Sequence, residues 1–121
     1  MKIPGPDHPI TLTRAKTRWQ ARLNGQVVAD SGGAIVLAEA AYPQVIYFPR
    51  ADIIAQAFAK TPRSTHCPYK GDASYFTVAA DGATAENAAW SYETPFPAME
   101  AITDHIAFYP SLVEVAPVRG G

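Results

Sequence analysis

Residues Arg18–Asp30 read RWQARLNGQVVAD, and this stretch decides the class of fold. Apolar and polar residues alternate over Arg18–Leu23, and this period of two indicates a strand with one buried face. The pair Asn24-Gly25 follows directly. An Asn-Gly pair is the strongest short-range hairpin signal, because both central residues of a type I′ turn need a positive φ. The stretch therefore predicts a β-hairpin.

Short apolar runs, separated by Gly, Pro and Asp-Gly signals, recur along the rest of the chain. Those that we predict as strands lie at residues 26–30, 34–39, 44–48, 74–79, 88–92, 106–109 and 112–115. In residues 51–60 the apolar period changes to a helical one, and Pro62 would stop a helix there. Residues 65–72 contain Pro68 and Gly71 and are typical of a loop. The sequence predicts a mainly-β fold of curled antiparallel sheets with one α-helix near 51–60.

Length and charge limit the size of the protein and its partners. The 121 residues, of 13.0 kDa, predict a single domain over residues 1–121, and the terminal 119–121 are expected to fray. With 48% hydrophobic and 17% charged residues, the chain is expected to fold rather than stay disordered. Lys plus Arg number 10 and Asp plus Glu 11. This balance predicts no nucleic acid and no membrane surface as partner, because both attract surplus positive charge.

The few cysteine and histidine residues argue against metal or cofactor chemistry. Cys67 is the single cysteine, so neither an internal disulfide nor a paired-cysteine zinc site can form. The three histidines are scattered, and we predict no metal and no cofactor. Residues 1–6 lack the apolar region of a secretory signal, and the apolar runs are too short to span a membrane. These features predict a reduced, cytoplasmic location.

The stretch with the most chemically reactive side chains lies around Cys67. Its thiol precedes the ammonium group of Lys70 by three residues, and a nearby positive charge favours the thiolate form of a cysteine. Cys67 is therefore a candidate nucleophile. Two other interpretations stay open: a small buried apolar residue, as free cysteines often are, or part of the wall of a binding pocket.

Several blocks of sequence together resemble one family. They are His8–Ile10, Asn24-Gly25 with Ala29–Ser31, Tyr47–Asp52, Thr65–Gly71, Tyr75, Trp90–Tyr92, Pro95 and Ile106–Pro110. In this order they are similar to the Domain of Unknown Function 427 family (DUF427), over nearly the whole chain. The resemblance implies a small β-rich domain of β-tent (Mss4-like) architecture, whose zinc-binding cysteine pairs are missing here, and it implies no settled activity.

The positions that match this family together predict one pocket. The residues expected to contact a ligand there are Arg50, Asp52, Tyr69, Lys70, Tyr75, Trp90 and Tyr92. Aromatic walls with a few charged groups are the usual composition of a small-molecule site. The first functional hypothesis is therefore a protein that binds a small planar or anionic ligand around Cys67, Lys70 and Trp90. A small enzyme with Cys67 as nucleophile is the second, and a protein-interaction or scaffold domain, including a homodimer, is the third.

Overall fold

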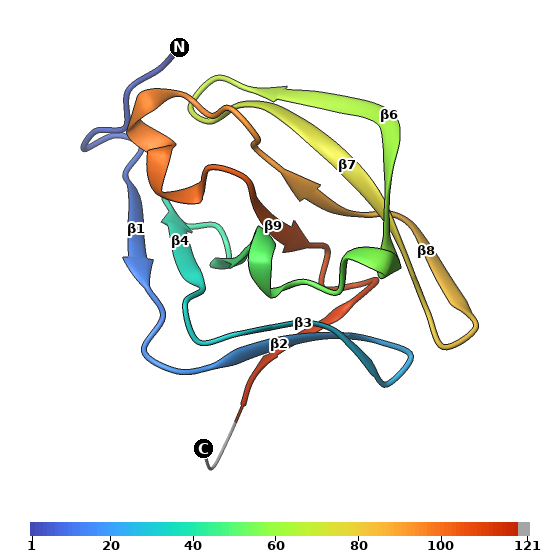
Figure 1. Cartoon of the computed structure of the whole chain (residues 1–121). Helices are drawn as coiled ribbons and strands as arrows, with labels where there is room; N and C mark the ends of the chain where they lie inside the picture. Colours follow the sequence, from blue (N-terminus) through green and yellow to red (C-terminus); the bar gives the residue numbers. More distant parts are fainter. Residues whose placement is uncertain (119–121) are drawn as a thin grey trace.

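The computed structural model describes residues 1–118; residues 119–121, where fraying is predicted, lie outside the described part. Two antiparallel sheets make up the fold (Figure 1). The larger sheet has the order β1 (Ile10–Arg14), β4 (Ile35–Glu39), β5 (Val45–Pro49), β9 (His105–Phe108), β8 (Ala83–Ser91), β7 (Gly71–Ala80), β6 (Phe58–Cys67). The smaller sheet has the order β10 (Glu114–Pro117), β2 (Trp19–Leu23), β3 (Gln26–Ser31). The predicted mainly-β class with antiparallel sheets is confirmed.

The predicted hairpin at the start of the chain is present as β2 and β3. Asn24 and Gly25 have φ angles of 51° and 84°, as a type I′ turn requires. The two strands pair from Leu23 with Gln26 to Trp19 with Ser31. A second tight turn, at Asp81 and Gly82, also has two positive φ angles, 49° and 79°, and joins β7 to β8.

Side chains of the larger sheet alternate between its two faces, so its apolar residues form two separate clusters. Tyr47 and Tyr75 belong to one cluster, whereas their neighbours Phe48 and Phe76 belong to the other. The Phe48 cluster includes buried residues of the smaller sheet, such as Val28, so it joins the two sheets. Because successive side chains of a strand point to opposite faces, the larger sheet is buried on both faces in this region.

The α-helix predicted near 51–60 is replaced by two short 3-10 turns, η1 (Arg50–Asp52) and η2 (Ala55–Ala57), after which β6 begins at Phe58. A helical segment therefore lies where expected, but it consists of 3-10 turns and ends at Ala57. The cause is pairing with the smaller sheet: Ile53 bridges Ala29, and the backbone N–H of Ile54 donates to the carbonyl of Val28 at 2.8 Å. These bonds engage groups that an α-helix would use internally.

The loop predicted over residues 65–72 is also shorter than expected. Strand β6 continues to Cys67, and β7 already begins at Gly71, which leaves a tight connection between them. The sequence also predicted no strand over β1, and it assigned the two ends of β6 to a helix and a loop. Elsewhere, η3 (Pro97–Ile102) is a further 3-10 segment.

The larger sheet opens between β5 and β9. The two strands pair only through Phe48 with Ile106 and Pro49 with His105. Before Phe48, β5 continues to pair with β4 on its other side, through Tyr47 with Ile35 and onward to Val45 with Leu37. Residues 45–47 thus have a partner strand on one side only, and the two cavities described next lie along this opening.

Candidate functional site

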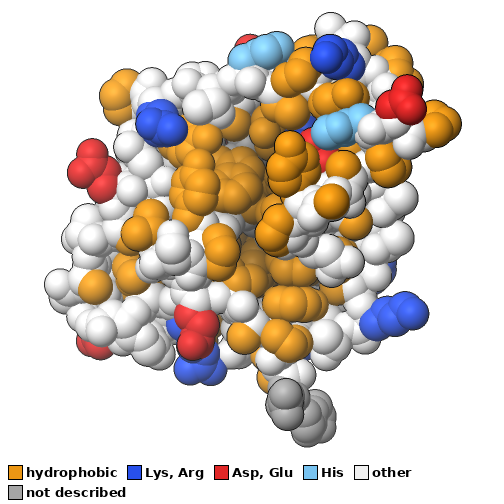
Figure 2. All heavy atoms as spheres, turned by 180° about the vertical axis from the view of Figure 1, so that it is seen from behind, with side chains coloured by type: hydrophobic (Ala, Val, Ile, Leu, Met, Phe, Trp, Pro, Cys, Tyr) orange, Lys and Arg blue, Asp and Glu red, His pale blue; other side chains and the backbone are white. Residues whose placement is uncertain are grey.

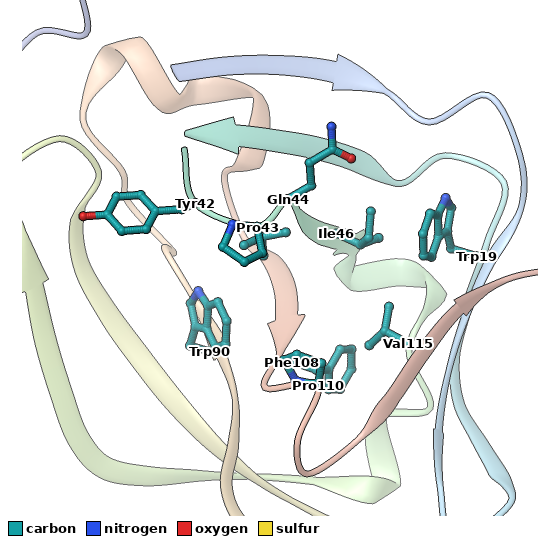
Figure 3. Close-up of a pocket in the computed structure, with 10 residues that line it drawn as sticks. Trp19, Tyr42, Pro43, Gln44, Ile46, Trp90, Phe108, Pro110 and Val115 are labelled. Atoms are coloured by element: carbon teal, nitrogen blue, oxygen red, sulfur yellow. The ribbon is translucent and has the colours of Figure 1, made fainter. Parts of the chain in front are cut away.

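The larger cavity is an apolar groove with a volume of about 520 Å³. Its walls come from the β4–β5 connection, the ends of β8 and β9, and the smaller sheet (Figure 3). We call it the apolar groove and define it by Trp19, Tyr42, Pro43, Gln44, Val45, Ile46, Trp90, Phe108, Pro110 and Val115. Gln44 is the one member with a polar aliphatic side chain. Figure 2 shows apolar side chains gathered around a hollow on one face of the molecule.

The smaller cavity, with a volume of about 250 Å³, is more polar. Tyrosine hydroxyls and one ion pair contribute the polar part of its lining. We call it the tyrosine cavity and define it by Leu37, Glu39, Val45, Tyr47, Lys70, Tyr75, Trp90, Tyr92 and Tyr109. Lys70, Tyr75, Trp90 and Tyr92 were predicted from the sequence as pocket residues, and they line this one cavity.

Trp90 and Val45 line both cavities, so the groove and the tyrosine cavity adjoin. Trp90 is half-buried, and its ring lies 4.7 Å from the ring of Tyr109, tilted by 49°. In Figure 3 the Trp90 ring faces the groove, with Tyr42 and Pro43 on the neighbouring connection. The indole therefore forms part of the wall between an apolar compartment and a polar one.

Lys70 is held in the tyrosine cavity by an ion pair. It is only 7% exposed, and its Nζ donates to Glu39 Oε1 at 2.5 Å. The second oxygen of Glu39 bonds Nε2 of His8 at 2.7 Å. Burial alone would raise the pKa of Glu39, but the hydrogen bonds from Lys70 and His8 outweigh it and lower the pKa below 4.5. Glu39 is therefore ionised near neutral pH and balances the charge of Lys70.

The tyrosine hydroxyls of the cavity fall into two groups. Tyr75 bonds Tyr109 at 3.3 Å and Thr65 at 3.0 Å, while the guanidinium group of Arg63 lies 4.8 Å from the centre of the Tyr75 ring. Tyr47 and Tyr92 are both buried, and burial raises the pKa of both far above its ordinary value. Because a buried phenolate is costly, these two hydroxyls keep their protons and act as neutral donors.

The thiol of Cys67 lies near the cavity but lines neither cavity. Its Sγ is 3.8 Å from Lys70 Nζ, and the half-buried side chain packs against the cluster that contains Tyr47. The predicted proximity of the thiol to Lys70 is thus present. However, the ammonium group is bonded more closely to Glu39 than to the sulfur.

The remaining predicted site residues have other partners and line neither cavity. Arg50 donates to Asp104 at 2.8 Å and stacks over the ring of Phe76 at 5.0 Å. Asp52 accepts a 2.5 Å hydrogen bond from the buried hydroxyl of Ser31. These contacts connect η1 to β3 and to the segment before β9.

Tyr69 is likewise outside the two cavities. Its ring stacks on His8 with a centroid distance of 4.3 Å and an interplanar angle of 8°. Next to it, the backbone N–H of Lys2 donates to the carbonyl of Pro68 at 2.7 Å. Tyr69 therefore fixes the N-terminal segment, and through His8 it supports Glu39.

Sequence reasoning missed Glu39, Tyr47 and Tyr109 in the tyrosine cavity, and most of the groove. A partial signal existed for Tyr47, since alternation along β5 places it and Phe48 on opposite faces. No local pattern marks Glu39 as the partner of Lys70, because the two residues are 31 positions apart.

Within residues 1–118, the histidine, cysteine and acidic side chains form no group of three or more that could hold a metal ion. Over the same residues, no helix is long and apolar enough to cross a membrane.

Comparison with known proteins places the chain in a family. No curated protein matches the sequence. A family model described as "Domain of unknown function (DUF427)" matches residues 11–119, which cover most of the chain. This agrees with the resemblance carried by the Cys67–Gly71 block and by Trp90–Tyr92. The chain belongs to the DUF427 family.

Proposed function

We propose that this protein binds a small, planar, largely apolar molecule whose body lies in the apolar groove and whose polar end enters the tyrosine cavity. The observation that carries the proposal is the sharing of Trp90 and Val45 by the two cavities. A ligand lying against Trp90 would then contact an apolar compartment and a polar one at once. Of the residues predicted from the sequence, Lys70, Tyr75, Trp90 and Tyr92 enter this proposal.

The size and lining of the groove support the proposal. Its volume of about 520 Å³ falls in the usual range of small-molecule pockets, roughly 300–1,000 Å³. Two indoles, a phenyl ring and two prolines offer flat apolar surfaces. Flat rigid side chains favour a planar ligand, because stacking buries much area and orders few rotatable bonds.

A fluorescence titration tests the proposal. Both tryptophans of the chain, Trp19 and Trp90, line the groove, so an occupant should change the intrinsic emission. The probe is phenylnaphthylamine, a neutral planar dye. We expect saturable quenching of tryptophan emission together with a rise in dye emission. A linear, non-saturating response up to the solubility of the dye would contradict the proposal.

Two neighbouring residues of β10 supply a matched pair of variants. Val115 lines the groove, whereas Glu114 is exposed and its side chain points to the opposite face of the strand. Val115→Lys places a charge in the groove wall and should weaken dye binding at least tenfold. Glu114→Lys adds a charge on the same strand and should leave dye binding unchanged. Equal effects of the two substitutions would show that the dye binds elsewhere.

The third sequence hypothesis, association with a second copy, predicts a different result. If a second copy of the chain covered the groove, Val115→Lys would convert a dimer to a monomer. Sedimentation equilibrium of the wild type and of both variants separates this outcome from small-molecule binding.

A further inference from the structure

The polar side chains of the tyrosine cavity offer hydrogen-bond donors. Lys70 carries three N–H bonds. One donates to Glu39 at 2.5 Å and a second, weaker one points to Cys67 Sγ at 3.8 Å. Among residues 1–118 these are its only hydrogen-bond partners, so one N–H of Lys70 is left for an acceptor in the cavity that the side chain lines.

Two tyrosines add further donors. The hydroxyl of Tyr47 accepts from the indole of Trp90 at 3.2 Å, and its own hydrogen has no acceptor in the described part of the chain. The hydroxyl of Tyr92 forms no hydrogen bond with any residue from 1 to 118, although Tyr92 lines the cavity. It is also not one of the fully buried polar atoms that lack a partner, which are Arg50 Nε and Ser91 Oγ. The Tyr92 hydroxyl is therefore open to a molecule in the cavity.

The strongest acceptor of the same cavity, the Glu39 carboxylate, is already engaged. Lys70 occupies one oxygen of Glu39, and His8 occupies the other. The hydroxyls of Tyr75 and Tyr109 bond each other at 3.3 Å. A ligand that presents an acceptor thus finds unused donors on Lys70 and Tyr92, whereas a ligand that presents a donor must share the carboxylate with Lys70 and His8 or use a weaker phenolic oxygen.

The net charge of the cavity determines whether a charged or a neutral acceptor group of a ligand fits it better. Lys70 and Glu39 together carry no net charge, so a carboxylate entering the cavity would find no unpaired cation inside it. A further cation, Arg63, stacks on Tyr75 from an exposed position, where water screens its charge. Removing an anion from water without a counter-ion costs several kcal/mol, about the gain of several neutral hydrogen bonds.

We infer that the polar end of the ligand is a neutral carbonyl group, which accepts hydrogen bonds from Lys70 and Tyr92 while the planar body of the ligand lies against Trp90. This inference rests on the proposed function and narrows its ligand class to planar compounds that carry a ketone, aldehyde, quinone or amide carbonyl.

Three naphthalene derivatives of similar size test the inference. Acetylnaphthalene carries a neutral carbonyl, ethylnaphthalene replaces it by an apolar group, and naphthoate carries an anion. Their affinities are measured by quenching of tryptophan emission in the wild-type protein. We expect acetylnaphthalene to bind about tenfold more tightly than either of the others, the effect of one to two hydrogen bonds.

The variant Tyr92→Phe tests the contribution of the Tyr92 hydroxyl as a hydrogen-bond donor to the ligand. It removes only a hydroxyl that has no partner within residues 1–118, so the fold should be unaffected. We expect the affinity for acetylnaphthalene to fall about fivefold and that for ethylnaphthalene to stay unchanged. The matched control is Tyr69→Phe, which removes a hydroxyl from a residue that lines neither cavity, keeps the ring that stacks on His8 and should change neither affinity.

The outcomes separate the inference from the proposed function. Equal binding of acetylnaphthalene and ethylnaphthalene would overturn the carbonyl inference and leave the proposed function standing. Tighter binding of naphthoate would overturn it in favour of an anionic ligand. No saturable binding of any of the three compounds would overturn both.

Discussion

The indole N–H of Trp90 donates to the hydroxyl of Tyr47 at 3.2 Å, and the two rings meet edge to face at 87°. Trp90 lies on β8 and Tyr47 on β5, and β9 separates these strands in the sheet. The bond therefore joins β8 to β5 at the level where β5 and β9 no longer pair. It also fixes the ring that the groove and the tyrosine cavity share.

Removing the Tyr47 hydroxyl should destabilise the protein. In Tyr47→Phe the indole N–H of the half-buried Trp90 loses its acceptor, and the loss of such a hydrogen bond costs about 0.5–1.5 kcal/mol. Urea unfolding, followed by circular dichroism, gives the change in the free energy of unfolding. Tyr42→Phe, at an exposed position, should change it by less than about 0.5 kcal/mol. A cost for Tyr47→Phe as small as that of the control would show that the bond contributes little.

Glu39 should make stability depend on pH in the acid range. Its pKa is lowered in the folded protein, so the unfolded chain binds the proton more readily. Its contribution is fully present above the ordinary value of 4.5 and is lost as the pH falls through the lower, folded pKa. Urea unfolding at a series of acid pH values measures this slope.

A pair of amide substitutions assigns that slope to Glu39. The variant Glu39→Gln should flatten the pH dependence of the free energy of unfolding. The exposed Glu114→Gln should leave it as in the wild type. If both variants retained the wild-type slope, other carboxylates, such as Glu93 with its bonds to Lys60 and Ser74, would be responsible.

Cys67 should be dispensable for ligand binding. Its side chain lines neither cavity, so Cys67→Ala should bind phenylnaphthylamine with unchanged affinity and lose about 1 kcal/mol of stability from reduced packing. The enzyme hypothesis predicts instead that iodoacetamide alkylates Cys67 in the folded protein faster than it alkylates a model peptide. We expect slower alkylation, because the thiol is half-buried; faster alkylation would favour the nucleophile.

The β2–β3 turn allows a test of backbone strain without any change in packing. A Cβ added to Gly25 would meet no atom within 4 Å, but its φ of +84° is unfavourable for other residues. Gly25→Ala should therefore cost about 1 kcal/mol in thermal unfolding. Gly5, where an added Cβ is equally free and no positive φ applies, is the control, and Gly5→Ala should cost nothing. A neutral Gly25→Ala would show that the turn relaxes.

The sequence predicted those features that depend on neighbours along the chain. The Asn24-Gly25 turn and the strands that flank it follow from local backbone preferences, and the structure confirms them. The helix expected near 51–60 is present only as short 3-10 turns, for the opposite reason. Hydrogen bonding of Ile54 to Val28 is a contact between distant segments, and it outweighed a helical period that was locally correct.

The candidate site was also predicted only in part, because its residue types are visible in the sequence and their contacts are not. Lys70, Tyr75, Trp90 and Tyr92 were recognised by residue type and family resemblance, and they line one cavity. Arg50, Asp52 and Tyr69 were grouped with them, yet they pack elsewhere. Residue type indicates which side chains suit a pocket but does not indicate which strands bring them together.

By itself, the sequence determined the β-rich class, the positions of its tight turns and the aromatic and basic residue types available for a site. Only the tertiary structure decided that β5 and β9 separate after two paired residues, and that Glu39 at the end of β4 meets Lys70 between β6 and β7. The physical reason is range: turns and alternation depend on residues a few positions apart, whereas an opening between strands depends on how the whole sheet packs on both faces.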